Sequence, residues 1–459
     1  MFMMPIKPLI AEDLVSDPRV LHAKKLLIEA LTDHKKLLTT VHPPDSSRRK
    51  EYKKAIEQLS QYRGAPLWHP YIGSGIGNGA LVELSDGSIK YDMICGMGAY
   101  SWGHSNEELA DVAIDAAISN TVMQGNLQQN NDVLELSKLL TDASGLDHCF
   151  LTTSGAMACE NALKIAFQKK FPAHRVLAFD KCFMGRTLAL SHITSRPEYR
   201  EGLPTAIAVD HIPFFDYHNP EKSIISSLEA LEYLLSKNRG QYAAMSFELI
   251  QGEGGVYPGS RDFFISLMDV LKKNNIAIII DEVQTFGRTP QLFAYQHFGL
   301  EKYVDIVTIG KFSHACATLF TKEYAPRPGL VSQTLLSSTA AIRSAIVIIK
   351  TMLNDEYFGD GGKIVEIHNR FTSQLQKLSE KYPLSGPFGC GGMIAFTPFG
   401  GERKRVLKLV HTLFEEGVIT FIAGREPTRV RLLPPIGSIT YEDIDNVIEI
   451  IETQIIRYC

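Results

Sequence analysis

The chain has 459 residues, of which 45% are hydrophobic and 21% are charged, and its formal net charge is −4. This length allows two or three domains around a large core, and the composition is ordinary for a globular protein. The small net charge gives no electrostatic reason to expect nucleic acid or an anionic membrane as a partner. No apolar run reaches the roughly 18 residues that a spanning helix needs, so no membrane span is expected.

The chain has seven cysteines, and no two of them are spaced as Cys-x-x-Cys. An odd number of scattered cysteines favours reduced thiols in the cytosol over a disulfide framework or a zinc site. The first residues contain too short an apolar run, and acidic residues too early, for a secretory signal peptide. We therefore expect a cytoplasmic protein without a metal site.

Residues 1–65 are rich in Lys, Arg, Glu and Leu and are predicted to form two helices, interrupted near His42–Lys50. Another helix is expected shortly after Gly103, with Ser105 as its N-cap and Glu108 three residues later.

The segment 75–80 formally fits the dinucleotide-binding pattern G-x-G-x-x-[GA]. That pattern binds a dinucleotide only where it follows a strand and opens a helix. Here residues 81–93 alternate in polarity and are predicted to form a β-hairpin with Asp86-Gly87 at its turn. A nucleotide site is therefore not expected.

From Asp147 onward, strand and helix patterns alternate, as in α/β proteins with a parallel sheet. Strands are predicted at 149–153, 175–179, 243–250, 276–281, 305–311 and 317–321, and helices at 155–170, 260–275 and 338–353. From about Asp355 the pattern changes to that of a small α+β domain. Helices are predicted there at 363–382, 405–417 and 441–455, and strands at 392–399, 418–423 and 429–435.

Two of these strands end in residues that can do chemistry. Ile276–Asp281 closes with a carboxylate, and Asp305–Lys311 closes with an ammonium. Near-continuous Ile and Val indicate strands buried on both faces, and ligands of such sheets bind at the carboxyl ends of the strands. Asp281 and Lys311 are therefore expected to share one crevice, where they could serve pyridoxal phosphate: the lysine as its Schiff-base partner and the carboxylate as the partner of its ring nitrogen.

Other interpretations of these two residues also fit their local sequence. A lysine at the end of a strand is often simply solvated. An apolar strand followed by Asp-Glu also fits the Walker B strand of a P-loop enzyme, which requires the motif GxxxxGK[ST] elsewhere in the chain. Neither Gly310-Lys311-Phe312 nor Gly362-Lys363-Ile364 fits that motif, so an NTPase is not favoured.

The blocks at 247–264, 276–300 and 305–311 resemble, in order and spacing, those of the class III pyridoxal-phosphate aminotransferases of the ornithine/acetylornithine type. The likeness runs from about Leu81 to the end of the chain, and the segment 152–164 is similar to that of the lysine ε-aminotransferases. The resemblance implies the α/β type I fold, in which a large domain has a mostly parallel seven-stranded sheet. It also implies a homodimer with shared active sites. The domain boundaries that we predict are an N-terminal extension at 1–65, the first part of the small domain at 66–100, the large domain at 101–350 and the rest of the small domain at 351–459.

The same resemblance assigns the cofactor site. It places the phosphate at the backbone of Gly155 and Ala156, where a helix N-terminus favours an anion, although Ser-Gly before a helix is also common as ordinary capping. Phe183 and Val283 are expected on opposite faces of the ring, and Gln284 at its phenolic oxygen. By resemblance, Thr334 reaches the cofactor phosphate of the partner subunit. By themselves the residues would favour a core aromatic for Phe183.

For substrates, the resemblance implies that Arg186 binds a carboxylate in a bidentate fork. It also implies that Glu253 pairs with Arg431 when one substrate is bound and releases it for the other. A surface ion pair for Arg186, and a static bridge between Glu253 and Arg431, remain the alternatives from the sequence.

The implied activity is ping-pong transfer of the terminal amine of lysine, ornithine or N-acetylornithine to 2-oxoglutarate. Met157 stands where most acetylornithine enzymes have Glu, and residues 312–316 and 335–338 lack glycines that relatives have. A 4-aminobutyrate-type transaminase, an aminomutase and a non-catalytic binding protein of the same fold therefore remain alternatives.

Overall fold

The computed structural model describes residues 8–354 and 356–458, and its centre is a seven-stranded sheet in the order β5-β13-β12-β11-β8-β6-β7. Only β13 runs antiparallel to its neighbours, so the prediction of a mostly parallel sheet is confirmed. The strands are β5 (His148–Thr152), β6 (Arg175–Phe179), β7 (Ala208–Ile212), β8 (Tyr242–Phe247), β11 (Ala277–Glu282), β12 (Ile306–Ile309) and β13 (Cys316–Phe320).

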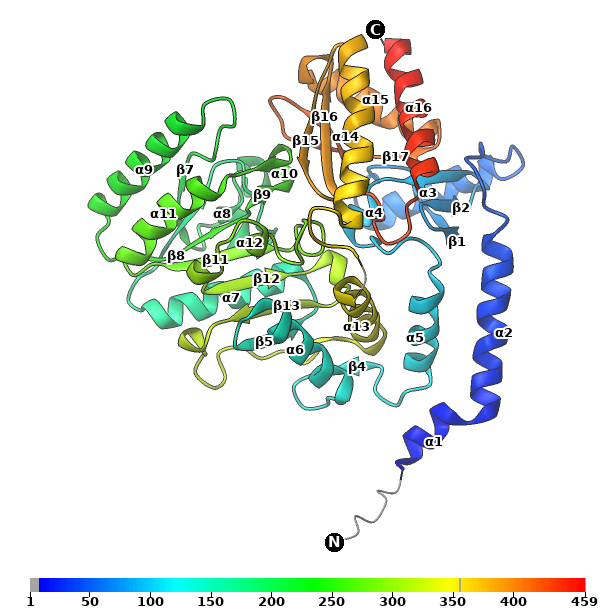
Figure 1. Cartoon of the computed structure of the whole chain (residues 1–459), viewed down its shortest axis with the longest axis horizontal. Coiled ribbons are helices and arrows are strands. Elements are labelled where there is room, and N and C mark those ends of the chain that lie inside the picture. The colour runs from blue at the N-terminus through cyan, green and yellow to red at the C-terminus, as the bar shows by residue number, and fades with distance from the viewer. Residues whose placement is uncertain (1–7, 355, 459) are drawn as a thin grey trace.

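Helices cover both faces of this sheet (Figure 1). The helices of this large part are α5 (Glu107–Ala117), α6 (Asn131–Ser144), α7 (Gly155–Lys170), α9 (Pro220–Lys237), α11 (Arg261–Lys273) and α13 (Thr339–Asn354), with short turns at α8 (Leu190–Ile193), α10 (Gly252–Gly255) and α12 (Ala294–His297). Of these, α5 packs against α13 and lies away from the sheet. Along β11, Ile278 and Ile280 join the apolar cluster that contains α11, whereas Ala277 and Ile279 join the cluster that contains α7. Because both faces of this strand are covered, its sequence is apolar without alternation.

The register of the central strands determines what meets at the edge of the sheet. β11 and β12 are parallel, with Asp281 opposite Thr308 and Glu282 opposite Ile309. The two strands therefore end at the same edge, and Lys311 follows β12 directly in a short 3-10 turn at Lys311–Ser313.

A smaller part of the molecule contains two four-stranded sheets, β1-β2-β3-β17 and β15-β16-β19-β18, with α14, α15 and α16 packed beside them. The elements are β1 (Gly73–Asn78), β2 (Leu81–Leu84), β3 (Ile89–Asp92), α14 (Lys363–Lys381), β15 (Leu384–Cys390), β16 (Met393–Pro398), α15 (Arg403–Glu415), β17 (Val418–Ile419), β18 (Phe421–Ala423), β19 (Arg429–Leu432) and α16 (Tyr441–Tyr458). The predicted hairpin is confirmed as β2 and β3. The pairing of β17 with β3 joins segments from the two ends of the chain, while the exact domain boundaries stay a prediction.

The single strand predicted at 418–423 is wrong, because the chain changes sheets within it. β17 pairs with β3, whereas β18 pairs with β19. Between them the carbonyl of Thr420 lies 2.9 Å from Nε2 of the His69 side chain, so that it bonds outside the strand ladders.

The N-terminal region forms three helices instead of two: α1 (Ile10–Ser16), α2 (Pro18–Lys35) and α3 (Arg49–Arg63), none of which has a buried residue. The side chain of Asp17 accepts a hydrogen bond from Arg19 N and Pro18 occupies the first helical position, so a new helix starts there. Figure 1 shows α2 beside α5, with α1 projecting beyond the lower end of α2. Lys24 forms ion pairs with Asp111 and Asp115 of α5.

The N-cap predicted for α5 is wrong by one residue. Asn106 caps the helix, and its side chain accepts a hydrogen bond from Leu109 N at 3.1 Å. Ser105 has a φ of 50° and uses its hydroxyl to accept a hydrogen bond from Gly77 N at 3.0 Å. A contact with β1, distant in sequence, therefore determines the conformation of Ser105.

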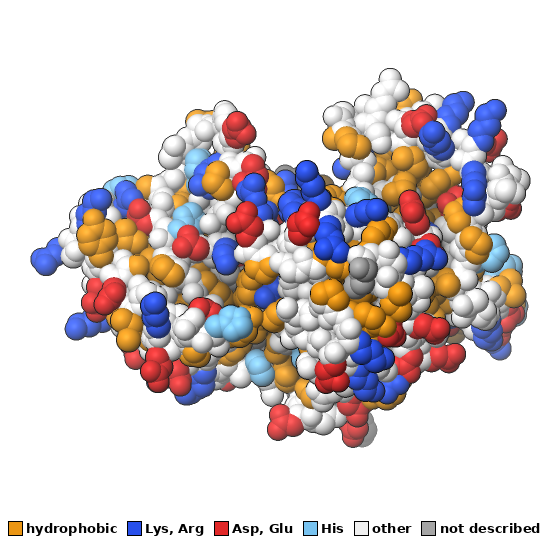
Figure 2. Space-filling model, turned by 90° about the horizontal axis from the view of Figure 1, so that it is seen from above, with side chains coloured by type: hydrophobic (Ala, Val, Ile, Leu, Met, Phe, Trp, Pro, Cys, Tyr) orange, Lys and Arg blue, Asp and Glu red, His pale blue; other side chains and the backbone are white. Residues whose placement is uncertain are grey.

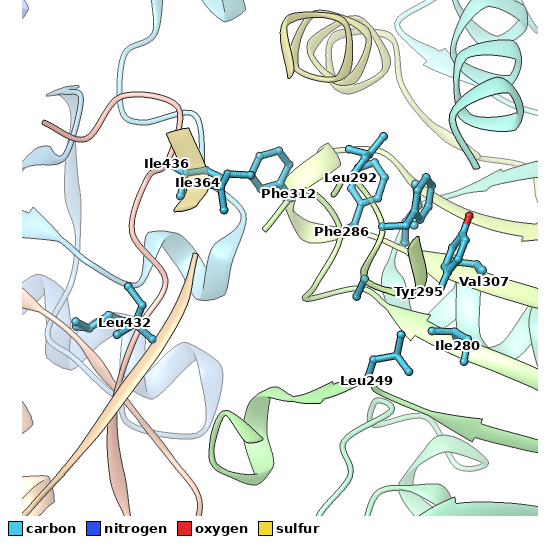
Figure 3. Packing of buried hydrophobic residues seen from close by; sticks show 14 of the residues in the cluster. Leu249, Ile280, Phe286, Leu292, Tyr295, Val307, Phe312, Ile364, Leu432 and Ile436 are labelled. Atoms are coloured by element: carbon cyan, nitrogen blue, oxygen red, sulfur yellow. The ribbon is translucent and has the colours of Figure 1, made fainter. Parts of the chain in front are cut away.

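One apolar cluster extends from the large sheet into the smaller part, so the two parts share a core. In Figure 3 the ring of Phe312, the residue after Lys311, lies between Ile364 and Leu292. Seen from above, acidic and basic side chains are interspersed over the surface (Figure 2). Within the two described ranges, no helix combines the length and the apolar character needed to cross a membrane.

Asp305 holds the loop before β12 against β11. Its side chain is buried and accepts hydrogen bonds from Ile278 N at 2.8 Å and from Lys272 Nζ at 2.6 Å. We expect Asp305→Ala to lower the free energy of unfolding by roughly 1–3 kcal/mol, because the N–H of Ile278 would remain buried without an acceptor. Urea unfolding followed by circular dichroism measures this.

The control is Lys272→Ala, which removes only the partly exposed partner and should cost less than about 1 kcal/mol. Equal losses in the two variants would mean that the ion pair, and not the bond to the strand, accounts for the stabilisation.

Candidate active site

A cavity of about 540 Å³ lies at the carboxyl ends of β8, β11 and β12, and residues of β18 and β19 close its other side. All the residues predicted for the site except Thr334 line it. They are Gly155, Ala156, Phe183, Arg186, Glu253, Asp281, Val283, Gln284, Lys311 and Arg431. Residues from widely separated parts of the chain therefore meet in one pocket.

Lys311 and Asp281 share this pocket, as their strands predict. Burial of the ammonium lowers the pKa of Lys311 to about 8, although the nearby Asp281 carboxylate opposes this shift. Lys311 has a φ of 52°, in the left-handed region, where a non-glycine residue costs on the order of 1–3 kcal/mol and is most often found at functional sites. A lysine whose pKa is near neutrality can both accept and donate a proton.

The carboxylate of Asp281 is fixed by its neighbours. Its Oδ1 accepts a hydrogen bond from Val283 N at 2.8 Å, and Cys159 Sγ lies 3.5 Å from its Oδ2. Burial raises the pKa of Asp281 to about 6, while the Val283 N–H and the charge of Lys311 act against this rise. Asp281 is therefore mostly ionised at neutral pH, as the partner of a protonated ring nitrogen must be.

The pocket has features that fit a planar ring with a phosphate. Gln284 Oε1 is buried without a hydrogen-bond partner among the described residues, so it is available to a bound group. The absence of a side chain at Gly155 lets the helix N-terminus lie directly against Val283, because a Cβ at this position would lie only 2.6 Å from Val283 Cγ1. The residues present therefore fit pyridoxal phosphate.

The helix end predicted to hold a phosphate is the N-terminus of α7. Its N-cap is Ser154, whose side chain accepts a hydrogen bond from Met157 N at 3.2 Å, so ordinary capping is present. Gly155 and Ala156 follow at the first two helical positions and line the cavity. The first N–H groups of a helix have no acceptor within the helix and favour an anion.

Glu248 is the main residue whose part in the site the sequence did not predict. Its Oε2 accepts a hydrogen bond from Phe183 N at 2.9 Å, and its Oε1 accepts one from Gly252 N at 3.1 Å. It thereby fixes the backbone of the residue expected to stack on the ring. Burial, and next the nearby Asp281 carboxylate, raise the pKa of Glu248 to about 8. The sequence signal was a carboxylate at the end of a buried strand, the same signal that identified Asp281.

Arg186 is exposed at the cavity mouth, and its guanidinium lies over the ring of Tyr199, with Cζ 3.8 Å from the ring centroid. Among the described residues it has no salt-bridge partner within 4.0 Å, so the structure does not show the surface ion pair that was the alternative. The aromatic face positions the guanidinium and leaves its N–H groups available to a carboxylate.

Glu253 and Arg431 are paired, with Arg431 Nη2 3.3 Å from Glu253 Oε2. The side chain of Arg431 is 1% exposed, and the same Nη2 lies 3.0 Å from Met97 Sδ. Burial lowers the pKa of Arg431, although Glu253 acts in the opposite direction. Arg196, which no sequence pattern indicated, lies on the other side of Glu253, with 3.4 Å between Nη2 and Oε1.

Thr334 lies apart from these residues. It is exposed and does not line the cavity, and its carbonyl oxygen approaches Gly125 so closely that a Cβ there would lie 1.9 Å away. The following residues form β14 (Ser337–Ser338), which pairs with β4 (Met123–Gln124). The contact of Thr334 with the cofactor of a partner subunit therefore stays a prediction.

Other residues line the cavity that no local pattern indicated. They are Trp68, Met97, Arg196, Tyr199, Thr285, Arg403, Phe421 and Ile422. They come from loops, from short helical turns at Cys95–Gly98 and Pro197–Tyr199, from the start of α15 and from β18, and only tertiary packing brings them to the site. Over residues 8–354 and 356–458, no group of three or more His, Cys, Asp or Glu side chains is arranged to hold a metal ion.

A lysine, a carboxylate and a glutamine around one pocket, at the edge of a mostly parallel sheet, define an enzyme that uses pyridoxal phosphate. The sequence matches the class-III aminotransferase family over residues 72–455. This chain belongs to the class-III aminotransferases. It is an enzyme, and its cofactor is pyridoxal 5′-phosphate, as in the rest of that family.

Individual proteins that are similar to this chain are also aminotransferases. The acetylornithine aminotransferase of Prochlorococcus marinus subsp. pastoris is 30% identical over 376 residues, which are 78% of this chain and 86% of the relative. The succinylornithine transaminase of Photorhabdus laumondii is 29% identical, over 83% of this chain and 92% of its own. The solved structure of a lysine aminotransferase from M. tuberculosis superposes with a TM-score of 0.77 at 21% identity, over 88% of this chain and 100% of the other. It confirms the predicted fold.

The raised pKa of Glu248 gives the stability of the cofactor-free protein a pH dependence. Between its ordinary value of 4.5 and about 8, the native state holds a proton that the unfolded state has lost. The free energy of unfolding therefore falls as pH rises through this window. Glu248→Gln removes this contribution, which amounts to at most about 1.4 kcal/mol per pH unit, the effect of one proton.

Urea unfolding of both proteins at several pH values between 4.5 and 8 tests this expectation. The difference in unfolding free energy between variant and parent should grow in favour of the variant as pH rises. Parallel pH profiles would show that Glu248 is already ionised in the native state.

Proposed function

We propose that this aminotransferase moves the terminal amine of a basic amino acid, namely lysine, ornithine or N-acetylornithine, to 2-oxoglutarate in two half-reactions. The observation that carries the proposal is the Glu253–Arg431 ion pair on the wall of the pocket that holds Lys311 and Asp281. An ion pair that can open lets one site accept both an amine substrate and a dicarboxylate.

On the cofactor side, Asp281 would hold the ring nitrogen protonated and Gln284 would bond the phenolic oxygen. Phe183 and Val283 would enclose the ring, and the backbone N–H groups of Gly155 and Ala156 would hold the phosphate. When bound, pyridoxal phosphate supplies an electron sink for the carbon that carries the amine. Lys311 would be the residue that holds the cofactor covalently, and its amine would accept and return the proton of that carbon.

On the substrate side, Arg186 holds a substrate carboxylate in a bidentate fork. With the donor bound, Glu253 keeps Arg431 neutralised, so that no free cation repels an amine substrate. With 2-oxoglutarate bound, Arg431 leaves Glu253 and pairs with the second carboxylate. The names of the relatives support a donor of the ornithine or lysine type.

Two further parts of the proposal concern the assembly and the setting of the enzyme. We propose a homodimer in which Thr334 contacts the cofactor phosphate of the partner subunit. A cytoplasmic location stays a prediction from the usage of cysteine.

A screen of amine donors with 2-oxoglutarate tests the substrate class. Lysine, ornithine and N-acetylornithine should each be compared with 4-aminobutyrate, with glutamate formation as the measurement. Glutamate formed only from 4-aminobutyrate would favour a 4-aminobutyrate-type transaminase. Isomerisation of a donor without any glutamate would favour an aminomutase.

Lys311→Ala should abolish turnover and leave the fold intact, because no other amine takes its place in covalent binding and proton transfer. Borohydride reduction of the parent should attach the cofactor to the peptide that contains Lys311, and the variant should show no such attachment. Circular dichroism is the control for folding. Full activity of a folded variant would refute the assigned role.

Arg186→Lys should weaken binding of the substrate carboxylate by roughly 1–3 kcal/mol, the range for hydrogen bonds to charged groups. Lysine keeps the charge and loses the planar fork and the contact with the Tyr199 ring. The apparent affinities for donor and acceptor measure this, and values unchanged for both would remove Arg186 from the site.

A further inference from the structure

The carboxylate of Glu253 is shared between two arginines. Arg431 Nη2 lies 3.3 Å from Oε2, and Arg196 Nη2 lies 3.4 Å from Oε1. The same Arg196 nitrogen also donates to the main-chain oxygen of Glu253 at 3.4 Å. Each carboxylate oxygen therefore has its own cation, and loss of one cation leaves the other in place.

The two arginines differ in their surroundings. Arg431 is on β19 with its side chain 1% exposed, whereas Arg196 precedes a 3-10 turn at Pro197–Tyr199 and its side chain is 15% exposed. Arg196 lines both the candidate active site and a neighbouring cavity of about 400 Å³. It therefore stands in the wall between the active site and the outside.

From this wall a line of alternating charges runs to the surface. Arg196 Nη1 lies 3.8 Å from Glu198 Oε1, and Arg425 Nη1 lies 3.3 Å from the same oxygen. The side chain of Arg425 is 64% exposed, so the line ends in solvent. The guanidinium of Arg196 therefore has a carboxylate on each side, Glu253 toward the active site and Glu198 toward the surface.

We propose that Arg196 is a specificity-determining residue of this site, and the proposal rests on the function proposed above. Arg196 holds Glu253 while Arg431 turns to the second carboxylate of the acceptor. Without Arg196, the departure of Arg431 would leave a partly buried carboxylate unpaired, which is costly. With Arg196 in place Glu253 remains paired, so the ion pair opens at a lower free-energy cost and the dicarboxylate binds more tightly.

The test is Arg196→Gln in the holoenzyme, with glutarate as the probe. Glutarate is a five-carbon dicarboxylate without a reactive carbonyl, so calorimetry measures its binding apart from turnover, and butyrate is the monocarboxylate control. We expect the variant to bind glutarate roughly three- to tenfold more weakly, the loss of one partly exposed charged contact, with butyrate unchanged. In steady-state turnover the Michaelis constant for the acceptor 2-oxoglutarate should rise by the same factor, while that for the amine donor stays constant.

The double variant Arg196→Gln/Glu253→Gln separates this role from direct binding. With Glu253 neutral, nothing retains Arg431, so glutarate affinity should return at least to that of the parent. A loss that persists in the double variant would mean that Arg196 contacts the ligand itself, and it would overturn the proposal.

Arg425→Gln is the matched control, because it removes an arginine from the same line of charges at its exposed end. It should leave both affinities unchanged. Unchanged glutarate affinity in Arg196→Gln, or equal losses for glutarate, butyrate and donor, would also overturn the proposal. If the parent transfers no amine to 2-oxoglutarate, the proposed function fails instead, and the glutarate titration still decides the role of Arg196.

Discussion

The parallel pairing of β11 with β12 is the constraint on which the site depends. Asp281 lies opposite Thr308, so the carboxylate that ends one strand and the ammonium that follows the other meet at one edge of the sheet. Helices cover both faces of the sheet, so both strands are buried and their residues are mostly apolar. The buried carboxylate of Asp305 adds a hydrogen bond that holds the entry to β12 against β11. A shift of this register would separate the carboxylate of Asp281 from the ammonium of Lys311.

Around this edge the protein keeps several ionisable groups away from water. Burial raises the pKa of Asp281 and of Glu248 and lowers that of Lys311, so burial disfavours the charged form of each group. Such an arrangement costs stability, and it is typical of sites where protons must move near neutral pH. The buried Oε1 of Gln284 has no hydrogen-bond partner among the described residues, so it too is free to bond a group in the pocket.

The proposed substrate side of the pocket depends on a network of ion pairs. Arg431 and Arg196 lie on both sides of Glu253, so its carboxylate is the centre of a small network of charges. The side chain of Arg431 is almost fully buried. The core supports this geometry, because Phe312 directly after Lys311 packs into the cluster that also holds Ile364 of the smaller part. The two walls of the site are thus parts of one packed body.

By itself the sequence predicted six of the seven strands of the large sheet and the helices α7, α11 and α13, and it placed a carboxylate and a lysine at the strand ends. It did not predict β7, α6 or α9. Buried strands require continuous apolar residues, and a carboxylate or lysine directly after such a run is visible in the sequence alone. It also predicted the Glu253–Arg431 pair by resemblance. Only the tertiary structure decided the partners of Glu248, the second cation at Glu253 and the change of sheet near Thr420. These depend on contacts between segments far apart in the chain, which local patterns do not encode.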